Sequence, residues 1–341
     1  MSPLLDDRIT LAHGGGGKAM RDLVENVFRP AFRPEAMEDQ ARLSAAAFAE
    51  EGARLAFTTD GFVVHPIEFP GGDIGRIAVS GTVNDLAVGG ARPLWLSAAF
   101  IIEEGCELAL LRRVVASMAA EAARANVQVV TGDTKVVERG GADTLFVTTS
   151  GVGVIPPGRT LAATRVRPGD VAIVNGFLGN HGAAILAARG EMALSSGIES
   201  DCASLGALME SALAAAPGIR AARDATRGGL ASALNEIAAA AGCGIEIDED
   251  ALPLHPEVRG ISEILGLDPL YLANEGTLVL FAPEAEAADA LAGMRAVAEG
   301  REACIVGRAV EAHPGTVVQR TAFGGLRLVD MLVGDQLPRI C

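Results

Sequence analysis

Apolar residues recur along the chain in two patterns, which predict strands and helices that alternate. Short apolar runs between turn residues predict strands at 54–59, 127–130, 145–149, 171–174, 277–282 and 303–310. Apolar residues spaced three and four apart predict helices that start at Met20 and that cover 74–89, 107–125, 181–189, 203–215, 228–241 and 284–298. Strands and long helices in both halves predict an α/β or α+β fold with mixed sheets.

A turn-rich stretch from Ile155 to Asp170 marks the best boundary between two domains, because Pro and Gly occur near both of its ends. A chain of 341 residues is long enough for two domains that each bury a core. We therefore expect an N-terminal domain at 1–155 and a C-terminal α/β domain at 156–331. Residues 332–341 show no apolar period and predict a flexible, mobile tail.

The composition excludes several classes of protein. Half of the residues are hydrophobic, 4% are aromatic, and 43 acidic against 28 basic side chains give a formal net charge of −15. An acidic chain poor in aromatic residues suits neither nucleic acid nor an anionic membrane surface, and the hydrophobic share excludes disorder. The five cysteines form no CxxC pair, the chain starts without a signal peptide, and no apolar run approaches the roughly 18 residues of a membrane span. We therefore expect a cytoplasmic protein.

The basic residues are 26 arginines and only two lysines, Lys18 and Lys135. Genome composition explains the excess of arginine over lysine, but it does not explain which two positions keep lysine. Lysine offers a point charge whose pKa can be lowered, and arginine does not. Lys18 follows the run Gly14–Gly17 and precedes a predicted helix, an arrangement that can cradle a phosphate. The same run is also typical of a flexible loop. It is not a Walker A motif, because Ala19 stands where that motif requires Ser or Thr.

Candidate magnesium ligands are carboxylates beside apolar elements, and these are Asp60, Asp85, Asp133 and Asp224. Asp60 and Asp133 each follow an apolar strand, so we expect both in turns, where aspartate is also a common turn former. Asp85 lies in a predicted apolar helix, where a partly buried carboxylate needs a cation or strong donors. Carboxylates, water and nucleotide phosphates are the ligands that Mg²⁺ prefers, so these residues predict a magnesium–nucleotide site.

Two further residues are candidates for catalysis. Glu275 lies in a turn before a strand and suits either a general base with a raised pKa or a solvated loop glutamate. Cys341 ends the chain and suits either a carrier attachment point or a chance terminal cysteine, and its own carboxylate disfavours an attacking thiolate. Thr226 is expected to cap the helix that starts at 228.

Taken together, these motifs resemble the HypE family of hydrogenase maturation carbamoyl dehydratases, within the superfamily of aminoimidazole ribonucleotide synthetase and selenophosphate synthetase. The similarity runs along nearly the whole chain, through HGGGG at 13–17, TTDGFVV at 58–64, FPGGDIG at 69–75, GTVNDLAV at 81–88, TGDTKVV at 131–137, RDATRGGL at 223–230, DPLYLANEG at 268–276 and LPRIC at 337–341. The aspartate motifs are shared across the superfamily, whereas the terminal PRIC is specific to this family. One departure is Ala225, where family members often have Pro.

The resemblance implies a two-domain synthetase fold, whose N-terminal mixed-sheet domain binds ATP and dimerises, and a defined reaction. The maturation factor HypF places a carbamoyl group on the thiol of Cys341. ATP is then used to dehydrate this group to a thiocyanate, which supplies the cyanide ligand for the iron of [NiFe]-hydrogenase. The implied partners are a second copy of the chain, HypF and the HypC–HypD iron-scaffold complex.

The resemblance also implies roles for the candidate residues, with ATP and Mg²⁺ as cofactors. Asp60, Asp85, Asp133 and Asp224 would hold the metal and, with Gly15, Gly16, Gly17 and Lys18, the nucleotide. Lys135 and Glu275 would remove the two protons that the dehydration releases, in an order that stays open.

Two other functions stay open at this point. One is another ATP-dependent synthetase of the same superfamily, of the selenophosphate or purine-pathway type, which the terminal cysteine tail disfavours. The other is a non-enzymatic scaffold that only docks maturation partners, which the four aspartate motifs disfavour.

Overall fold

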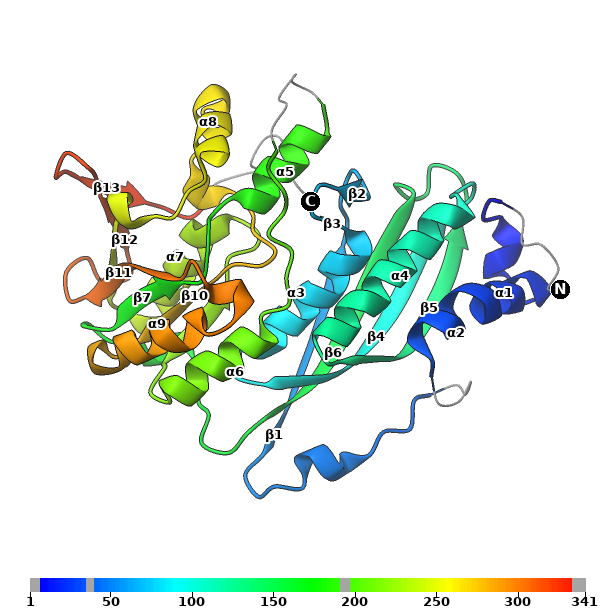
Figure 1. The fold of residues 1–341 in the computed structure, drawn as a ribbon, viewed down its shortest axis with the longest axis horizontal. Helices are drawn as coiled ribbons and strands as arrows, with labels where there is room; N and C mark the ends of the chain where they lie inside the picture. Colours follow the sequence, from blue (N-terminus) through cyan, green and yellow to red (C-terminus); the bar gives the residue numbers. More distant parts are fainter. Residues whose placement is uncertain (1–6, 35–39, 191–196, 333–341) are drawn as a thin grey trace.

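The computed structural model describes residues 7–34, 40–190 and 197–332, which form two lobes around two separate sheets (Figure 1). The N-terminal sheet has the strand order β1–β6–β4–β5, formed by β1 (Arg54–Phe62), β4 (Arg92–Glu103), β5 (Gln128–Val137) and β6 (Leu145–Ile155). Strands β4 and β5 pair in parallel, whereas β6 pairs antiparallel with both β1 and β4. The sheet is therefore mixed, as expected.

Two helices cover one face of this sheet, α3 (Ile74–Val88) and α4 (Leu108–Arg124). Helix α3 is apolar around its circumference because it packs on the sheet, on α4 and on the C-terminal lobe at once. Asp73 caps its first turn by accepting a hydrogen bond from the backbone N–H of Arg76 at 2.9 Å. The opposite, open face of the sheet carries the exposed side chains of Leu55, Phe57 and Ile101.

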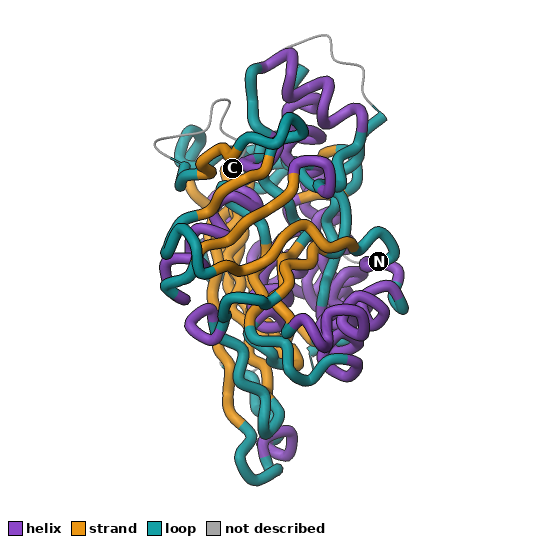
Figure 2. Tube along the Cα trace, turned by 90° about the vertical axis from the view of Figure 1, so that its left-hand side faces the viewer, coloured by secondary structure: helices purple, strands orange, loops and turns teal. Residues whose placement is uncertain are grey.

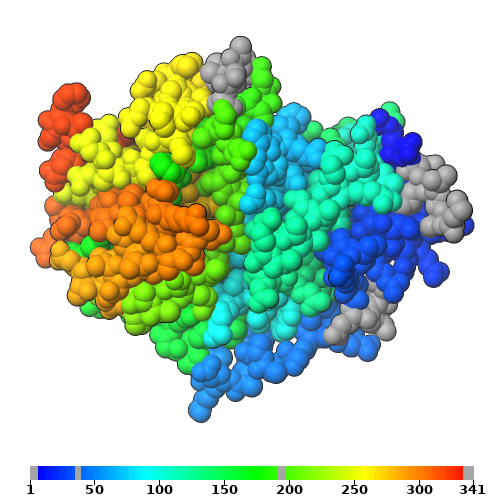
Figure 3. All heavy atoms as spheres, viewed as in Figure 1, coloured from blue at the N-terminus to red at the C-terminus, as the bar shows by residue number. Residues whose placement is uncertain are grey.

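The N-terminal segment lies against β5, at the end of the molecule far from the C-terminal lobe (Figures 1 and 3). It consists of the short helix η1 (Leu11–Gly14) and a continuous helical stretch with one π-helical turn, α1 (Lys18–Leu23), η2 (Val24–Phe28) and α2 (Arg29–Phe32). A narrow arm tipped by η3 (Ala45–Phe48) projects beyond β1, as Figure 2 shows from the side. A small hairpin, β2 (Glu68–Phe69) and β3 (Gly72–Asp73), precedes α3.

The C-terminal lobe is built on a seven-stranded sheet with the order β13–β12–β9–β11–β7–β10–β8. Its strands are β7 (Val171–Val174), β8 (Ala221–Asp224), β9 (Gly244–Asp248), β10 (Leu278–Ala282), β11 (Cys304–Val310), β12 (Val317–Arg320) and β13 (Leu326–Val329). Its longer helices are α5 (Asn180–Ala188), α6 (Gly206–Ala215), α7 (Gly229–Ala241), α8 (Pro256–Leu265) and α9 (Ala287–Arg295). Short helical turns connect them at η4 (Ala163–Arg165), η5 (Glu249–Ala251), η6 (Pro269–Tyr271), η7 (Glu284–Glu286) and η8 (Ala298–Gly300).

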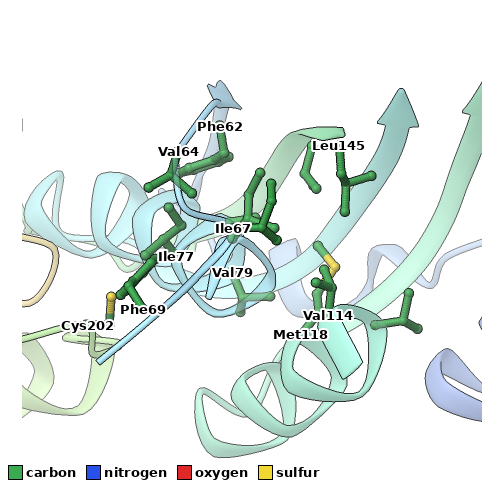
Figure 4. Packing of buried hydrophobic residues seen from close by; sticks show 14 of the residues in the cluster. Phe62, Val64, Ile67, Phe69, Ile77, Val79, Val114, Met118, Leu145 and Cys202 are labelled. Atoms are coloured by element: carbon green, nitrogen blue, oxygen red, sulfur yellow. The ribbon is translucent and has the colours of Figure 1, made fainter. Parts of the chain in front are cut away.

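The hydrophobic core of the N-terminal lobe continues into the C-terminal lobe. Buried residues of α3 and α4 form one cluster with Ile185 of α5 and Val258 of α8. Figure 4 shows part of this cluster, in which Phe69 of the hairpin lies beside Cys202 from the other lobe. The two lobes are therefore joined by apolar packing as well as by the connecting chain.

Several predicted elements are confirmed, including the strand at 171–174 and the helices at 74–89 and 107–125, with ends shifted by at most one residue. The predicted turns at Asp60 and Asp133 are wrong, because β1 and β5 continue through both residues. Backbone pairing with β6 and β4 extends these strands beyond their apolar runs, so the polar side chains simply alternate between the two faces. The helix predicted at 284–298 is divided into η7, α9 and η8.

The α/β class is confirmed. None of the described helices combines the length and the apolar composition that a membrane crossing requires. The predicted tail extends beyond Leu332, outside the described residues.

Candidate functional site

An acidic cluster lies where α3, β1 and β8 meet, and its members are Asp60, Asp85, Asp224 and Glu275. Asp85 projects from α3 toward β1, where its Oδ2 accepts a hydrogen bond from the Thr58 hydroxyl at 2.8 Å. Asp60 lies two residues further along β1, on the same face as Thr58. Asp224 ends β8, the edge strand of the C-terminal sheet, and α3 contacts this strand directly. Both lobes therefore contribute carboxylates to one site.

Three carboxylates of the acidic cluster, Asp85, Asp224 and Glu275, have raised pKa values, and burial is the largest cause in each case. Burial raises the pKa of Asp85 to about 6, aided by the charges of Asp224 and Asp60, while the Thr58 hydrogen bond opposes the shift. Burial likewise raises the pKa of Asp224. Burial raises the pKa of Glu275 well above its usual range, with further contributions from nearby carboxylates. Unrelieved repulsion of this kind is typical of a site that receives a cation.

Of the two interpretations of Glu275, a solvated loop glutamate does not fit the structure. Its side chain is half-buried, and its raised pKa is the property that a general base needs.

Arg227 is the positive side chain recorded nearest the acidic cluster, with Nη2 3.8 Å from Oδ1 of Asp60. It lies just before α7, whose N-cap is Gly228 in the left-handed conformation, with φ of 73°. The predicted cap at Thr226 is wrong, because the chain makes a left-handed turn at Gly228 that favours glycine. The Thr226 side chain instead hydrogen-bonds Asp224 and partly opposes the rise that burial causes in the pKa of that carboxyl.

A second group, the glycine–lysine group, lies along β5 and comprises Gly14–Gly17, Lys18, Asp133 and Lys135. Lys135 Nζ lies 3.0 Å from Asp133 Oδ2, and both side chains are more than half exposed. Gly14 packs so closely on β5 that a Cβ there would lie 2.7 Å from the Val136 nitrogen. The glycine run is thus held beside Lys135, with Gly15, Gly16 and Gly17 exposed to solvent.

The two groups do not meet within one chain. Strands β1 and β5 are opposite edges of the N-terminal sheet, three strand spacings or about 14 Å apart. Asp60 pairs with Thr149 and shares its helix-covered face, whereas Asp133 pairs with Ala99 on the open face. The assignment of all four aspartates to one metal ion stays a prediction, and within a single chain Asp133 lies on the wrong face for it.

A cavity of about 200 Å³ lies between the N-terminal helical stretch and β5, beside the glycine–lysine group. Its apolar lining includes Met20, Val24, Phe28 and Phe32, and its β5 wall runs from Val129 to Thr134. The periodicity of the helix indicates only that these residues face inward, so the sequence did not identify a cavity.

The acidic cluster suits a hard divalent cation such as Mg²⁺, because its donors are carboxylate oxygens whose repulsion a cation would relieve. Across the described ranges 7–34, 40–190 and 197–332, no three His, Cys, Asp or Glu side chains converge closely enough to hold a metal by themselves. Phosphate oxygens and water would complete the coordination, which is the usual arrangement for Mg²⁺ bound with a nucleotide.

Comparison with known proteins identifies relatives over almost the whole chain. The family model described as AIR synthase related protein, N-terminal domain, matches residues 38–155, and the corresponding C-terminal domain model matches 167–319. The carbamoyl dehydratase HypE of Rhodobacter capsulatus is 75% identical over 338 residues, covering 99% of each chain.

Two solved structures have the same fold. A crystal structure of the hydrogenase maturation protein HypE in complex with ATP has a TM-score of 0.92 and 43% identity, covering 97% of this chain and 99% of that one. A HypE–HypF complex has a TM-score of 0.80 and 42% identity, covering 91% and 99% of the two chains.

Proposed function

Because this chain belongs to the HypE family of carbamoyl dehydratases, within the AIR synthase related proteins, we propose that it uses ATP to dehydrate a carbamoyl group on its own Cys341. The product is a protein-bound thiocyanate, which supplies cyanide during maturation of [NiFe]-hydrogenase. The observation that carries the proposal is the acidic cluster, whose repelling carboxylates suit magnesium and the phosphates of ATP.

The reaction requires phosphate transfer because an amide oxygen is a poor leaving group. The carbamoyl oxygen attacks the γ-phosphorus of ATP and ADP departs, while the nitrogen loses one proton to give an iminophosphate. Loss of the second nitrogen proton and of phosphate then forms the C≡N bond. A bound Mg²⁺ supplies charge neutralisation at the phosphates, and Asp60, Asp85 and Asp224 are the residues that would hold it.

Two groups are suited to take the two protons. Glu275 is a carboxylate whose surroundings raise its pKa, so it is a stronger base than an exposed glutamate. Lys135 is the only lysine besides Lys18 and lies next to Asp133.

The complete site requires a homodimer. The open face of the N-terminal sheet exposes Leu55, Phe57 and Ile101, an apolar surface typical of an interface. When two such sheets pack face to face about a two-fold axis, edge β5 of one can lie beside edge β1 of the other. The partner's Lys135 and glycine run then meet the acidic cluster, and the cavity beside β5 is suited to the adenine base of ATP.

The tail can reach such a site from its point of attachment. The Tyr271 hydroxyl donates to the Asp330 carbonyl at 2.8 Å, which holds the chain next to η6 and the start of α7. Nine residues follow Leu332, and nine extended residues span at most about 30 Å. Glu275 of the acidic cluster follows Tyr271 by only four residues, at most about 14 Å of chain. A carbamoyl group loaded by HypF on Cys341 would therefore be within reach of the acidic cluster, and the HypC–HypD complex would receive the cyanide.

Removal of Cys341 tests the function directly. Full-length protein incubated with HypF, its carbamoyl donor and ATP should gain the mass of a cyano group on the C-terminal peptide. The chain that ends at Ile340 should gain none, yet should bind ATP with unchanged affinity, because the acidic cluster is intact. A cyano adduct on another residue of the shortened chain would contradict the proposal.

Replacement of Lys135 tests whether this residue removes a proton or acts only through its positive charge. Arginine keeps the positive charge but does not release its proton in proteins, so Lys135→Arg should lose as much activity as Lys135→Ala, roughly 100-fold or more. The measurement is the rate of conversion of carbamoylated protein to thiocyanate at saturating ATP. Recovery of most of the rate by arginine would mean that Lys135 acts only through its charge.

A further inference from the structure

The segment 200–205 lies between the two lobes and is held from both sides. Toward the N-terminal lobe, the side-chain amide of Asn84 donates to the Ala203 carbonyl at 3.0 Å, and its oxygen accepts from the Leu205 N–H at 2.7 Å. The buried carboxylate of Glu121 accepts from the Ser204 N–H and hydroxyl at 3.2 and 2.7 Å. Asn84 is the neighbour of Asp85 on α3, so the segment is fixed relative to the acidic cluster.

Toward the C-terminal lobe, a single carboxylate holds the turn that carries Glu275. Asp201 Oδ1 accepts from the Glu275 N–H at 3.1 Å, and its Oδ2 accepts from the Gly276 N–H at 3.0 Å and from the Thr277 hydroxyl at 2.9 Å. The approach is close enough that a Cβ on Gly276 would lie 1.8 Å from the Asp201 carbonyl oxygen. Three consecutive residues thus share one acceptor group, which fixes the direction in which Glu275 leaves the backbone.

The charge of Asp201 also acts on Glu275. After burial, Asp201 is the largest cause of the raised pKa of Glu275, ahead of Asp224 and Asp60, while Arg227 opposes them. The Cys202 thiol also interacts with Glu275, and burial raises the pKa of this thiol well above its usual value, so it stays neutral. Burial raises the pKa of Asp201 itself, and the three hydrogen bonds that its carboxylate accepts oppose this rise.

We propose that Asp201 is a positioning residue for Glu275: its carboxylate fixes the turn that carries Glu275 through three hydrogen bonds and places a second acidic group beside it. The inference rests on the proposed role of Glu275 as a base. The hydrogen bonds that the Asp201 carboxylate accepts from other described residues all come from 275–277, so we expect its effect to pass through the turn that carries Glu275.

The test compares Asp201→Asn with Thr277→Val in the full-length protein, carbamoylated by HypF. The measured quantity is the single-turnover rate of thiocyanate formation between pH 5 and 9 at saturating ATP. The base must be ionised, so the rate falls on the acid side as Glu275 takes up a proton. Asp201→Asn removes a like charge, so this acid limb should move by roughly one pH unit to lower pH, with a plateau roughly tenfold lower.

Thr277→Val is the matched control because it removes one of the three hydrogen bonds and leaves the charge in place. It should lower the plateau a few-fold without moving the acid limb. An acid limb of Asp201→Asn that coincides with the wild-type limb would overturn the inference. If Asp201→Asn does not fold, the inference is overturned when the plateau rate of Thr277→Val equals that of the wild type. A wild-type rate in Glu275→Gln would contradict the proposed function of Glu275, which is a separate result.

Discussion

An equimolar mixture of Asp85→Asn and Lys135→Ala chains should recover about a quarter of the wild-type ATP turnover, although each variant alone is inactive. The reason is that Asp85 on α3 contacts edge strand β1 from the helix-covered side, whereas Lys135 lies on the opposite edge strand, β5, and faces the open side. If each site combines the acidic cluster of one chain with the glycine–lysine group of the other, a mixed dimer has one site with both defects and one intact site. Random exchange makes half of the dimers mixed, and each of these has one of its two sites intact.

The measurement is carbamoyl-dependent ATP hydrolysis after the two variants are unfolded together and refolded, or co-expressed with different affinity tags. Both variants keep Cys341, so supply of the carbamoyl group does not limit either site. The same mixture made from Asp85→Asn and Asp224→Asn should stay inactive. Each chain then carries a change in its own acidic cluster, so neither site of a mixed dimer is intact. Activity in neither mixture would mean that each site is built from a single chain.

Asp85→Asn should be inactive and at the same time more stable than the wild type. Under the proposed function Asp85 helps to hold Mg²⁺, so its loss should weaken charge neutralisation at the phosphates by several kcal/mol, a fall of about 100-fold or more in ATP turnover. In the absence of metal and nucleotide, however, the ionised Asp85 destabilises the fold, because burial and two like charges raise its pKa from 3.8 to about 6. Asparagine carries no charge and so does not destabilise the fold in this way. The free energy of unfolding at pH 7 should therefore rise by on the order of 2 kcal/mol.

The sign of the stability change can be checked by pH. The folded-state pKa of Asp85 is raised, so this group favours folding below its unfolded pKa and loses that contribution as pH rises toward 6. The stability gap between Asp85→Asn and wild type, from urea unfolding at fixed protein concentration, should therefore be largest above pH 6 and vanish near pH 4. The exposed Asp250→Asn makes the same chemical change away from the site, so it should alter neither turnover nor this gap. If the stability difference between Asp85→Asn and wild type did not change with pH, the ionised Asp85 carboxylate would not be the source of the destabilisation.

The sequence predicted candidate residues for the site, but it did not predict how they are arranged. Asp85 stood out because a carboxylate in an apolar helix has few structural explanations, and α3 does bury its neighbours on almost every side. Asp60 and Asp133 looked equivalent because each follows an apolar run. Only the strand order separates them, since pairing between distant segments decides which face and which edge a residue occupies.

The same limit applies to residues that the sequence did not mark at all. Asp201 is an ordinary aspartate in a loop, and its role depends on three donors that lie more than 70 positions further along the chain. The strand β4 was also missed, although it is central in the N-terminal sheet. Contacts of this kind are set by tertiary packing, on which local periodicity carries no information.

Helix α3 has one more consequence, which concerns motion. Its adjacent residues Asn84 and Asp85 hold the 200–205 segment and the acidic cluster, so any slide or rotation of the helix displaces both at once. With apolar packing continuous across the junction as well, opening the molecule at a hinge would break buried hydrogen bonds and expose core. Many ATP-dependent enzymes close one domain over a freely diffusing substrate. Under the proposed function the substrate is attached to Cys341 instead of diffusing freely, so no domain closure is needed to capture it. We therefore expect the rate of turnover to depend on how often the C-terminal end reaches the acidic cluster.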